Sequence, residues 1–237
     1  MHILQYLYDN SCPWNANTFA SASRYGNIEI LQWLKSNDCP WDLNSCSSAA
    51  GRGHLTALQW LRHRGAPWDQ NTCSAAAAGG HLDVLMWARA QGCPWSESTC
   101  SAAAENGHLM VLQWAIQNGC NYNDYICAYA AEGGHLDILR WSREREFPWD
   151  KSVCALAALR GHLNVLKWAR ENGCEWDEST CANAAETGQL GILQWVRENG
   201  CPWDMRTLEN AKKRGQRQLF KWAIENGCKI EISNKNH

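Results

Sequence analysis

The sequence predicts an all-α solenoid, a chain of short helical repeats stacked one after another. Two tryptophan series predict it, because each keeps a period of 27 residues without an insertion or deletion. The first series is Trp33, Trp60, Trp87, Trp114, Trp141, Trp168, Trp195 and Trp222, and the second is Trp14, Trp41, Trp68, Trp95, Tyr122, Trp149, Trp176, Trp203 and Ile230. A fixed period of a few tens of residues is the signature of repeat architectures.

The period also divides the chain. Eight repeats of 27 residues fit between Ala16 and Glu231, with bounds 16–42, 43–69, 70–96, 97–123, 124–150, 151–177, 178–204 and 205–231. Residues 1–15 form a partial N-terminal half repeat, and residues 232–237 form a polar tail. We therefore expect the 237 residues to form a single repeat domain.

The repeat 70–96 shows the expected first helix. Asn71 or Thr72 can cap its start, because short polar side chains accept hydrogen bonds from the first free backbone N–H groups. Cys73, Ala76 and Ala77 then fall at i, i+3 and i+4, which predicts one buried stripe. A Gly-Gly pair ends this helix.

The second helix of the same repeat is expected to begin near His81 and to bury Leu82, Leu85 and Ala88 on one face. Gly92 fits the left-handed position that closes a helix, and the Cys-Pro pair after it supplies an apolar contact and prevents continuation. First helices carry mostly Ala, Ser and Cys, whereas second helices carry Leu, Ile and Trp. Because small faces approach more closely, we expect the first helices to line a concave side.

Composition excludes several classes of protein. The 22 basic and 24 acidic side chains give a net charge of −2, which is wrong for a nucleic-acid polycation. No apolar stretch approaches the ~18 residues of a membrane span, and the first residues lack the pattern of a secretory signal. Thirteen cysteines, an odd number, favour reduced thiols. We expect a cytoplasmic protein, in the host cytoplasm if the chain is viral, with the nucleus as the alternative.

The runs Gly80–Leu85 (Gly-His-Leu-Asp-Val-Leu) and Gly92–Trp95 (Gly-Cys-Pro-Trp) resemble the ankyrin repeat, in which Ala-Ala-x-x-Gly-His-Leu leads through a second helix to Gly-Ala-Asp-Val-Asn. Ankyrin repeats have about 33 residues, and the missing six correspond to their β-hairpin finger. The resemblance implies a right-handed solenoid of helix-turn-helix ankyrin-like repeats without those fingers, which binds partners on its first-helix surface and turns. Gly-Cys-Pro-Trp turns are similar to those in ankyrin-like arrays of giant DNA viruses, algae and oomycetes.

Recurrent cysteine and histidine invite a metal interpretation, which the pattern does not favour. Cys93, Cys100 and His108 follow a Cys-x6-Cys-x7-His spacing that matches no standard zinc site. Non-ligating residues also replace the two cysteine columns in other repeats, at Phe19, Ala66, Phe147 and Leu208. We interpret the cysteines as buried apolar thiols and expect neither a metal nor another cofactor.

The histidine column is interpreted as structural. It contains His54, His81, His108, His135 and His162, and its other members are Asn27, Gln189 and Gln216. All of these side chains can donate a hydrogen bond to backbone at the turn between helices, but Asn and Gln cannot replace a titrating catalyst. No nucleophile set, carboxylate pair or phosphate loop stands apart from the repeat pattern, so we expect no enzyme activity.

The tryptophan ladders are also interpreted as packing. A stacking platform for single-stranded nucleic acid would need a basic groove, which the charge balance does not favour. The arginines near the ends of second helices are expected to complement the helix dipole and cover apolar surface with their stems. They are Arg62, Arg89, Arg143, Arg170 and Arg197.

A partner-binding site is expected where first-helix positions vary. The middle position is Ser48, Ala75 or Ala102 in the second to fourth repeats and becomes Tyr129 and then Leu156. We hypothesise an apolar patch with a charged rim, of the kind that interface hot spots use. The alternative is that Tyr129 and Leu156 only fill a gap between repeats. The candidate residues are Tyr125, Tyr129, Glu132, Leu156, Leu159, Arg160 and Glu186.

The two ends of the array differ. The last repeat holds seven basic and three acidic residues, and its candidate site residues are Lys212, Lys213 and Arg217. A polar cap is the default interpretation, and an acidic partner or a nuclear-import signal is the alternative. Residues 1–15 carry apolar side chains with no first helix before them, so we expect a frayed half repeat in a monomer, or weak end-to-end association through it.

The function expected from these patterns is a non-catalytic protein–protein interaction scaffold that binds an unidentified protein on the concave first-helix surface. One alternative is the substrate-recognition fragment of an adaptor such as a ubiquitin-ligase component. A less favoured alternative is nucleic-acid binding through the basic last repeat. No small-molecule substrate and no membrane association are expected.

Overall fold

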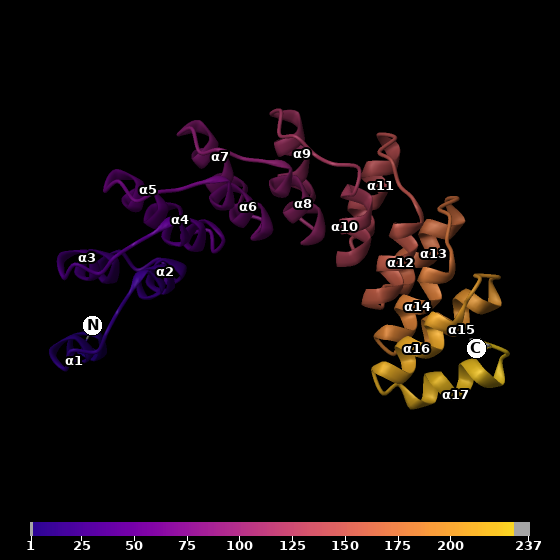
Figure 1. Cartoon of the computed structure of the whole chain (residues 1–237). Coiled ribbons are helices and arrows are strands. Elements are labelled where there is room, and N and C mark those ends of the chain that lie inside the picture. Colours follow the sequence, from indigo (N-terminus) through magenta and orange to yellow (C-terminus); the bar gives the residue numbers. More distant parts are fainter. Residues whose placement is uncertain (1, 230–237) are drawn as a thin grey trace, which may run out of the picture. The chain divides into compact units, whose positions relative to one another are not determined.

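The computed structural model describes residues 2–229, and in this range it is all-helical, with no strand. Ile230, which closes the second aromatic series, and the tail expected at 232–237 lie outside the described residues. The chain divides into an N-terminal unit, residues 1–123, and a C-terminal unit, residues 124–237. Each unit is described by itself (Figure 1). Within the described range, no helix combines the length and apolar character needed to cross a bilayer.

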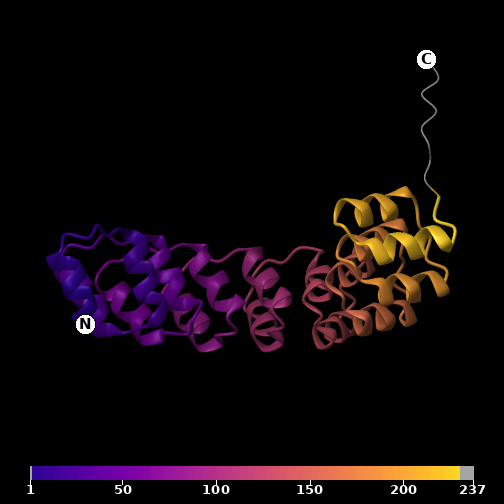
Figure 2. The same cartoon turned by 90° about the horizontal axis from the view of Figure 1, so that it is seen from below.

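The N-terminal unit contains nine helices over its described residues: α1 of the half repeat, followed by four pairs that follow the repeats (Figure 2). They are α1 (His2–Asp9), α2 (Ala16–Tyr25), α3 (Ile28–Ser36), α4 (Leu43–Ala50), α5 (Leu55–His63), α6 (Gln70–Ala78), α7 (Leu82–Ala90), α8 (Glu97–Glu105) and α9 (Leu109–Gln117).

The C-terminal unit continues the pattern with eight helices over its described residues. They are α10 (Ile126–Gly133), α11 (Leu136–Glu144), α12 (Lys151–Arg160), α13 (Leu163–Glu171), α14 (Glu178–Glu186), α15 (Leu190–Glu198), α16 (Met205–Lys213) and α17 (Arg217–Glu225). Each even-numbered helix from α2 to α16 starts at the first residue of an expected repeat, except that α10 starts two residues later.

The caps of the first helices lie two residues earlier than expected. Asp69, the last residue of the Pro-Trp-Asp turn, is the N-cap of α6, and its carboxylate accepts from the backbone N–H of Asn71 at 3.0 Å. The expectation that Asn71 or Thr72 caps this helix is therefore wrong, and Thr72 is buried instead. Asp69 can cap because its backbone is extended, at φ −145° and ψ −169°. The N-cap of α10 is Tyr125, which makes no side-chain cap bond.

The core of each unit lies where the first helices pack on one another and on the second helices of their own repeats. In the N-terminal unit α2, α4, α6 and α8 pack against one another in order, and α10, α12, α14 and α16 do so in the C-terminal unit. The stripe expected in the third repeat is confirmed, because Cys73, Ala76 and Ala77 are fully buried. Each second helix packs mainly on the first helix of its own repeat.

The tryptophan ladders are less buried than a packed core requires. Trp141 is 8% exposed, and the other tryptophans are half-buried. The two series interlock, because the indole in each turn packs edge-to-face on an indole of the next second helix. In the N-terminal unit Trp68 meets Trp87 with ring centroids 5.9 Å apart, and in the C-terminal unit Trp149 meets Trp168 at the same distance.

The arginines at the ends of second helices contact the turns that follow those helices. The Arg89 guanidinium lies 4.1 Å from the centre of the Trp95 ring and donates a hydrogen bond to the Cys93 carbonyl. Arg170 does the same with Trp176 and the Cys174 carbonyl. The role expected for this column is to complement the helix dipole. The structure adds a cation–π contact and a hydrogen bond to a carbonyl in the turn.

The histidine column joins consecutive repeats. His108 Nε2 donates to the Ala78 carbonyl at 3.1 Å, and His162 Nε2 donates to the Glu132 carbonyl at 3.0 Å. The expected backbone bond is confirmed for these residues and for His54, which bonds the Arg24 carbonyl at 3.0 Å. It is wrong for Asn27, whose side chain instead caps its own helix, α3.

Within each unit, a glycine of the preceding repeat receives the histidine ring. A Cβ on Gly80 would lie 2.5 Å from Nδ1 of His108, and a Cβ on Gly134 would lie 2.6 Å from Nδ1 of His162. Both glycines also have positive φ, +75° and +81°. The contact therefore links two neighbouring repeats, with the glycine in one repeat and the histidine in the next. We call this contact the Gly-His joint.

The cysteines of the turns act as donors as well as apolar filling. Cys93 Sγ donates to the Asp69 carbonyl at 3.4 Å, and Cys174 Sγ donates to the Asp150 carbonyl at 3.2 Å. Both acceptors belong to N-cap residues, so each thiol ties the end of a repeat to its beginning. Burial raises the pKa of the first-helix thiols Cys46 and Cys127 to about 12 and about 11, which keeps them protonated.

Candidate functional site

The surface that the sequence indicates includes two tyrosines near the N-terminal end of α10. Tyr125 is 56% exposed at the start of the helix, and Tyr129 is half-buried one turn later. Their ring centroids are 6.5 Å apart with an interplanar angle of 60°. The expected placement on one helix face therefore agrees with the observed geometry of these two rings.

A charged pair links this surface to the next first helix. Arg160 at the end of α12 donates to Oε1 of Glu132 on α10, from Nη2 at 2.6 Å and from Nε at 3.1 Å. The backbone carbonyl of Glu132 also accepts from His162. Glu132 is thus fixed through both its side chain and its backbone.

The surface continues over α12 and α14. Leu156 and Leu159 on α12 are both half-buried, so each keeps some solvent-accessible surface. Asn183 on α14 donates to the Ala155 carbonyl at 3.0 Å, and Thr187 donates to the Leu159 carbonyl at 2.7 Å. These bonds hold α14 against the leucine-bearing helix.

Glu186 does not join the pair formed by Glu132 and Arg160. Its carboxylate accepts from Nη2 of Arg214 at 2.5 Å, one repeat further along the chain. The charged rim expected around the patch is therefore two separate inter-repeat ion pairs. Each has a largely exposed arginine, so each contributes at most about 1 kcal/mol to stability.

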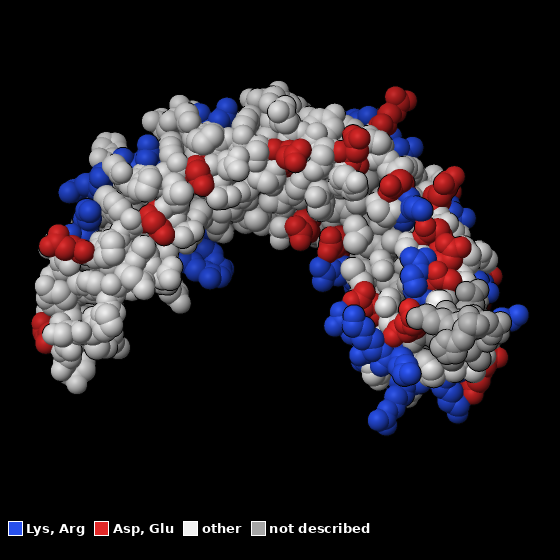
Figure 3. Space-filling model, viewed as in Figure 1, with Lys and Arg blue, Asp and Glu red and all other residues white. Residues whose placement is uncertain are grey.

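The basic residues of the last repeat are accessible. Lys212 and Lys213 are exposed at the end of α16, and Arg217 is exposed at the start of α17. In Figure 3 the C-terminal unit shows Lys and Arg interspersed with Asp and Glu, whereas the N-terminal unit is mostly uncharged in that view. The sequence expectation of a polar surface on the last repeat agrees with this exposure.

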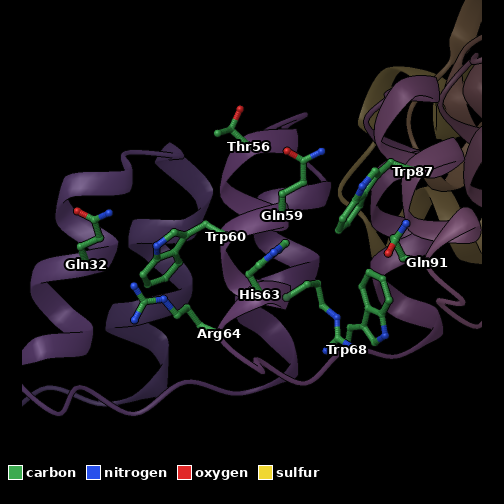
Figure 4. A pocket seen from close by; sticks show the side chains of 10 residues that line it. Gln32, Thr56, Gln59, Trp60, His63, Arg64, Trp68, Trp87 and Gln91 are labelled. Atoms are coloured by element: carbon green, nitrogen blue, oxygen red, sulfur yellow. The ribbon is translucent and has the colours of Figure 1, made fainter.

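A groove in the N-terminal unit was not expected from the sequence. It has a volume of about 980 Å³ and crosses the second helices α3, α5 and α7. In Figure 4, Trp60 and Arg64 lie on one side of His63, and Trp68, Trp87 and Gln91 lie on the other. The complete lining is Gln32, Thr56, Gln59, Trp60, Arg62, His63, Arg64, Trp68, Trp87 and Gln91.

The sequence does contain a signal for this groove. The residue two positions after the second helix's Arg62 column is Arg64 in the second repeat, where most other repeats have Asn, as at Asn118 and Asn172. The preceding residue is His63, where the last four repeats have Glu. The predicted site rests on variable first-helix columns, whereas this groove is formed by second helices and the turns after them.

Over residues 2–229, no group of three or more His, Cys, Asp or Glu side chains is arranged to hold a metal ion. The histidines with assigned bonds contact backbone carbonyls, and the turn thiols do so as well. The chemistry that the surfaces offer is hydrogen bonding, ion pairing and apolar contact.

Comparison with known proteins identifies the fold. No family model matches the sequence, and no curated protein matches it. The crystal structure of the human ASB11 ankyrin repeat domain is similar to this chain with a TM-score of 0.54 and 16% sequence identity. The match covers 75% of this chain and 96% of the ASB11 domain. Together with the stacked helix pairs, it shows that the chain has an ankyrin-like repeat fold.

Proposed function

We propose that this chain is a non-catalytic protein-interaction scaffold whose partner docks on the first-helix surface of the C-terminal unit. The docking surface comprises Tyr125, Tyr129, Glu132, Leu156, Leu159, Arg160 and Glu186. One observation carries the proposal: α10 and α12 pack side by side, and they present a tyrosine pair and a leucine pair around a carboxylate that is already fixed.

The chemistry of this surface suits a protein partner. Tyrosines provide large contact area at a small loss of side-chain entropy, and half-buried leucines extend that area. The Glu132–Arg160 pair leaves acceptor and donor atoms at the edge of the patch, where complementary charges favour one orientation of the partner. A partner segment with apolar side chains flanked by charged groups fits this arrangement.

An adaptor role uses the same surface. In that version the chain recognises a substrate for a larger assembly, such as a ubiquitin ligase, and a second protein attaches elsewhere. Nucleic-acid binding through Lys212, Lys213 and Arg217 is supported only by their exposure, and it would show a steep loss of affinity with salt. The thiol bonds of the turns favour a reducing compartment such as the cytoplasm, because oxidation would remove the donors.

The test is affinity capture with a surface variant. The wild type and a Tyr125→Ala, Tyr129→Ala, Leu156→Ala variant are used as baits, and captured proteins are identified by mass spectrometry. The matched control is Tyr25→Ala, Met86→Ala, Met110→Ala, which removes exposed apolar side chains from the N-terminal unit. Circular dichroism and urea unfolding establish that all three baits are folded.

A captured protein is then purified and its Kd is measured for each bait. We expect the surface variant to bind at least tenfold more weakly and the control variant to bind like the wild type. Equal binding by all three baits would place the site outside the docking surface. If binding is lost only in a Lys212→Glu, Lys213→Glu variant, the result would favour the basic last repeat as the binding site.

A further inference from the structure

The groove of the N-terminal unit departs from the repeat pattern. In five of the other seven repeats the Arg64 column holds an asparagine that turns back on its own helix, as when Asn118 Nδ2 donates to the Trp114 carbonyl at 2.8 Å. Asn172 makes the same bond to the Trp168 carbonyl at 2.8 Å. Arg64 makes no such bond, and its guanidinium lies 5.6 Å from the centre of the Trp60 ring. The second repeat therefore exchanges a helix-capping amide for an exposed cation.

The groove has an excess of positive charge. Arg62 is engaged within the protein, because its guanidinium lies 4.1 Å from the Trp68 ring centre and donates to the Ala66 carbonyl. His63 and Arg64 are exposed, and neither forms an ion pair within residues 2–229. None of the ten lining residues carries a carboxylate. The charge is complementary to an acidic ligand.

The groove also offers hydrogen-bonding groups along its length. The side-chain amides of Gln32, Gln59 and Gln91 come from three consecutive repeats, and none makes a hydrogen bond within the described part of the chain. A primary amide can donate to a carbonyl and accept from an N–H at once. Amides on successive second helices can therefore pair with the N–H and C=O groups of an extended peptide backbone.

We propose that this groove binds an extended peptide segment that carries carboxylates. Its backbone would contact the Gln32, Gln59 and Gln91 amides, and one carboxylate would contact Arg64 with His63 beside it. Neighbouring second helices lie at least as far apart as packed helices, which are about 8–10 Å apart, so three second helices span about 20 Å or more, the length of about six extended residues. The proposal is independent of the docking surface, because it concerns another unit and the second helices.

Nucleic acid and sugars fit the groove less well, because both need open ring faces. Arg62 covers a face of Trp68, Trp87 packs on the same ring at an interplanar angle of 64°, and Arg64 lies over Trp60. The rings therefore present mainly edges and N–H groups, which suit peptide carbonyls. Base stacking on aromatic faces is the main contribution in single-strand binding.

The test is selection from a random octapeptide library displayed on phage, with the full chain as bait. Three baits are compared: the wild type, Arg64→Asn and Arg145→Asn. Arg64→Asn installs the residue that other repeats have at this position, so the fold is retained. Arg145→Asn is the matched control, because Arg145 occupies the same column in the C-terminal unit and lies 4.8 Å from the Trp141 ring centre.

We expect the wild type and Arg145→Asn to enrich peptides rich in Asp and Glu, and Arg64→Asn to lose that enrichment. A fluorescein-labelled copy of the most enriched peptide should bind Arg64→Asn about tenfold more weakly by fluorescence anisotropy. A version with Lys in place of Asp and Glu should not bind. The proposal is overturned if no peptide is enriched, if enriched peptides are neutral or basic, or if Arg64→Asn binds like the wild type. Tighter Arg64-dependent binding of a single-stranded oligothymidine would equally overturn it.

Discussion

The two units build the same stack of first helices with different contacts. In the N-terminal unit the contacts are small: Ser48, Ala75 and Ala102 fill the middle column, and a Cβ on Gly51 would lie 3.4 Å from the Cβ of Ala75. In the C-terminal unit the column is occupied by Tyr129, Leu156, Asn183 and Asn210, and side chains bridge from helix to helix. The first helices of the N-terminal unit therefore lie close together, whereas those of the C-terminal unit are linked by side-chain hydrogen bonds.

The comparison distinguishes the contacts that stabilise the fold in both units from the positions that vary between them. The Gly-His joint, the arginine–tryptophan contact in the turn and the thiol bond to the N-cap occur in both units. The first-helix column and the ends of the second helices differ between them. Recognition is proposed at these variable positions in both units, on different faces.

The largest effect is expected from the tryptophan ladders, which should matter equally in both units. Trp114→Ala and Trp168→Ala should each lower the free energy of unfolding by about 3 kcal/mol, at the low end for a buried aromatic because both rings are half-buried. Urea unfolding followed by circular dichroism measures the loss, with Gln113→Ala and Lys167→Ala as controls. A loss confined to one variant would show that this tryptophan series stabilises only one of the two units.

The next effect isolates the Gly-His joint. Gly80→Ala should cost about 2–3 kcal/mol, because positive φ strains any side chain and the new Cβ would also displace His108. Gly92→Ala is the matched control, since its φ is +78° but no atom lies within 4 Å of the new Cβ. It should cost only the strain, about 1 kcal/mol. Equal losses would mean that the histidine contact adds nothing to stability.

A smaller effect tests the bridges directly. Asn183→Ala should cost about 1 kcal/mol in the C-terminal unit, because the Ala155 carbonyl loses its side-chain donor. The reverse change, Ala102→Asn, places the same side chain in the same column of the N-terminal unit. A gain of similar size would show that this unit lacks only the donor. A loss would show that its helices are too close to accept the bridge.

The smallest effect is a pH dependence confined to the C-terminal unit. Lys151 lies 2.7 Å from Asp177, and hydrogen bonds from Lys151 and Ser179 lower the pKa of that carboxyl to about 2. An unfolded aspartate titrates near about 3.9, so the stabilisation is complete above pH about 4 and is lost as the pH falls to about 2.

Urea midpoints measured between these pH values should therefore fall less steeply for Asp177→Asn than for the wild type. Lys151→Met tests the cause, because it removes the partner and leaves the carboxyl. If Lys151→Met keeps the wild-type slope, the ion pair does not account for the pKa.

The sequence predicts the fold well because the period has no interruption. The helices predicted for one repeat therefore apply to the other repeats as well. The buried stripe at Cys73, Ala76 and Ala77 and the left-handed Gly92 follow from local rules and are confirmed. The partners of Arg89 and Cys93 could not be predicted, since they depend on where the turn places its carbonyls. The tyrosine face was predictable from helical spacing, whereas the pairing of Glu186 with Arg214 required the stacking geometry.

The Gly-His joint has a consequence for how such an array can change. A repeat that carries the histidine supplies the ring for the repeat before it and the glycine for the repeat after it, so neighbouring repeats of this kind form the same junction wherever they stand within a unit. The pairs Gly161 with Gln189 and Gly188 with Gln216 show that the ring can be replaced while the glycine stays. Within such a junction the side chain that fills the space can therefore change more freely than the glycine that receives it.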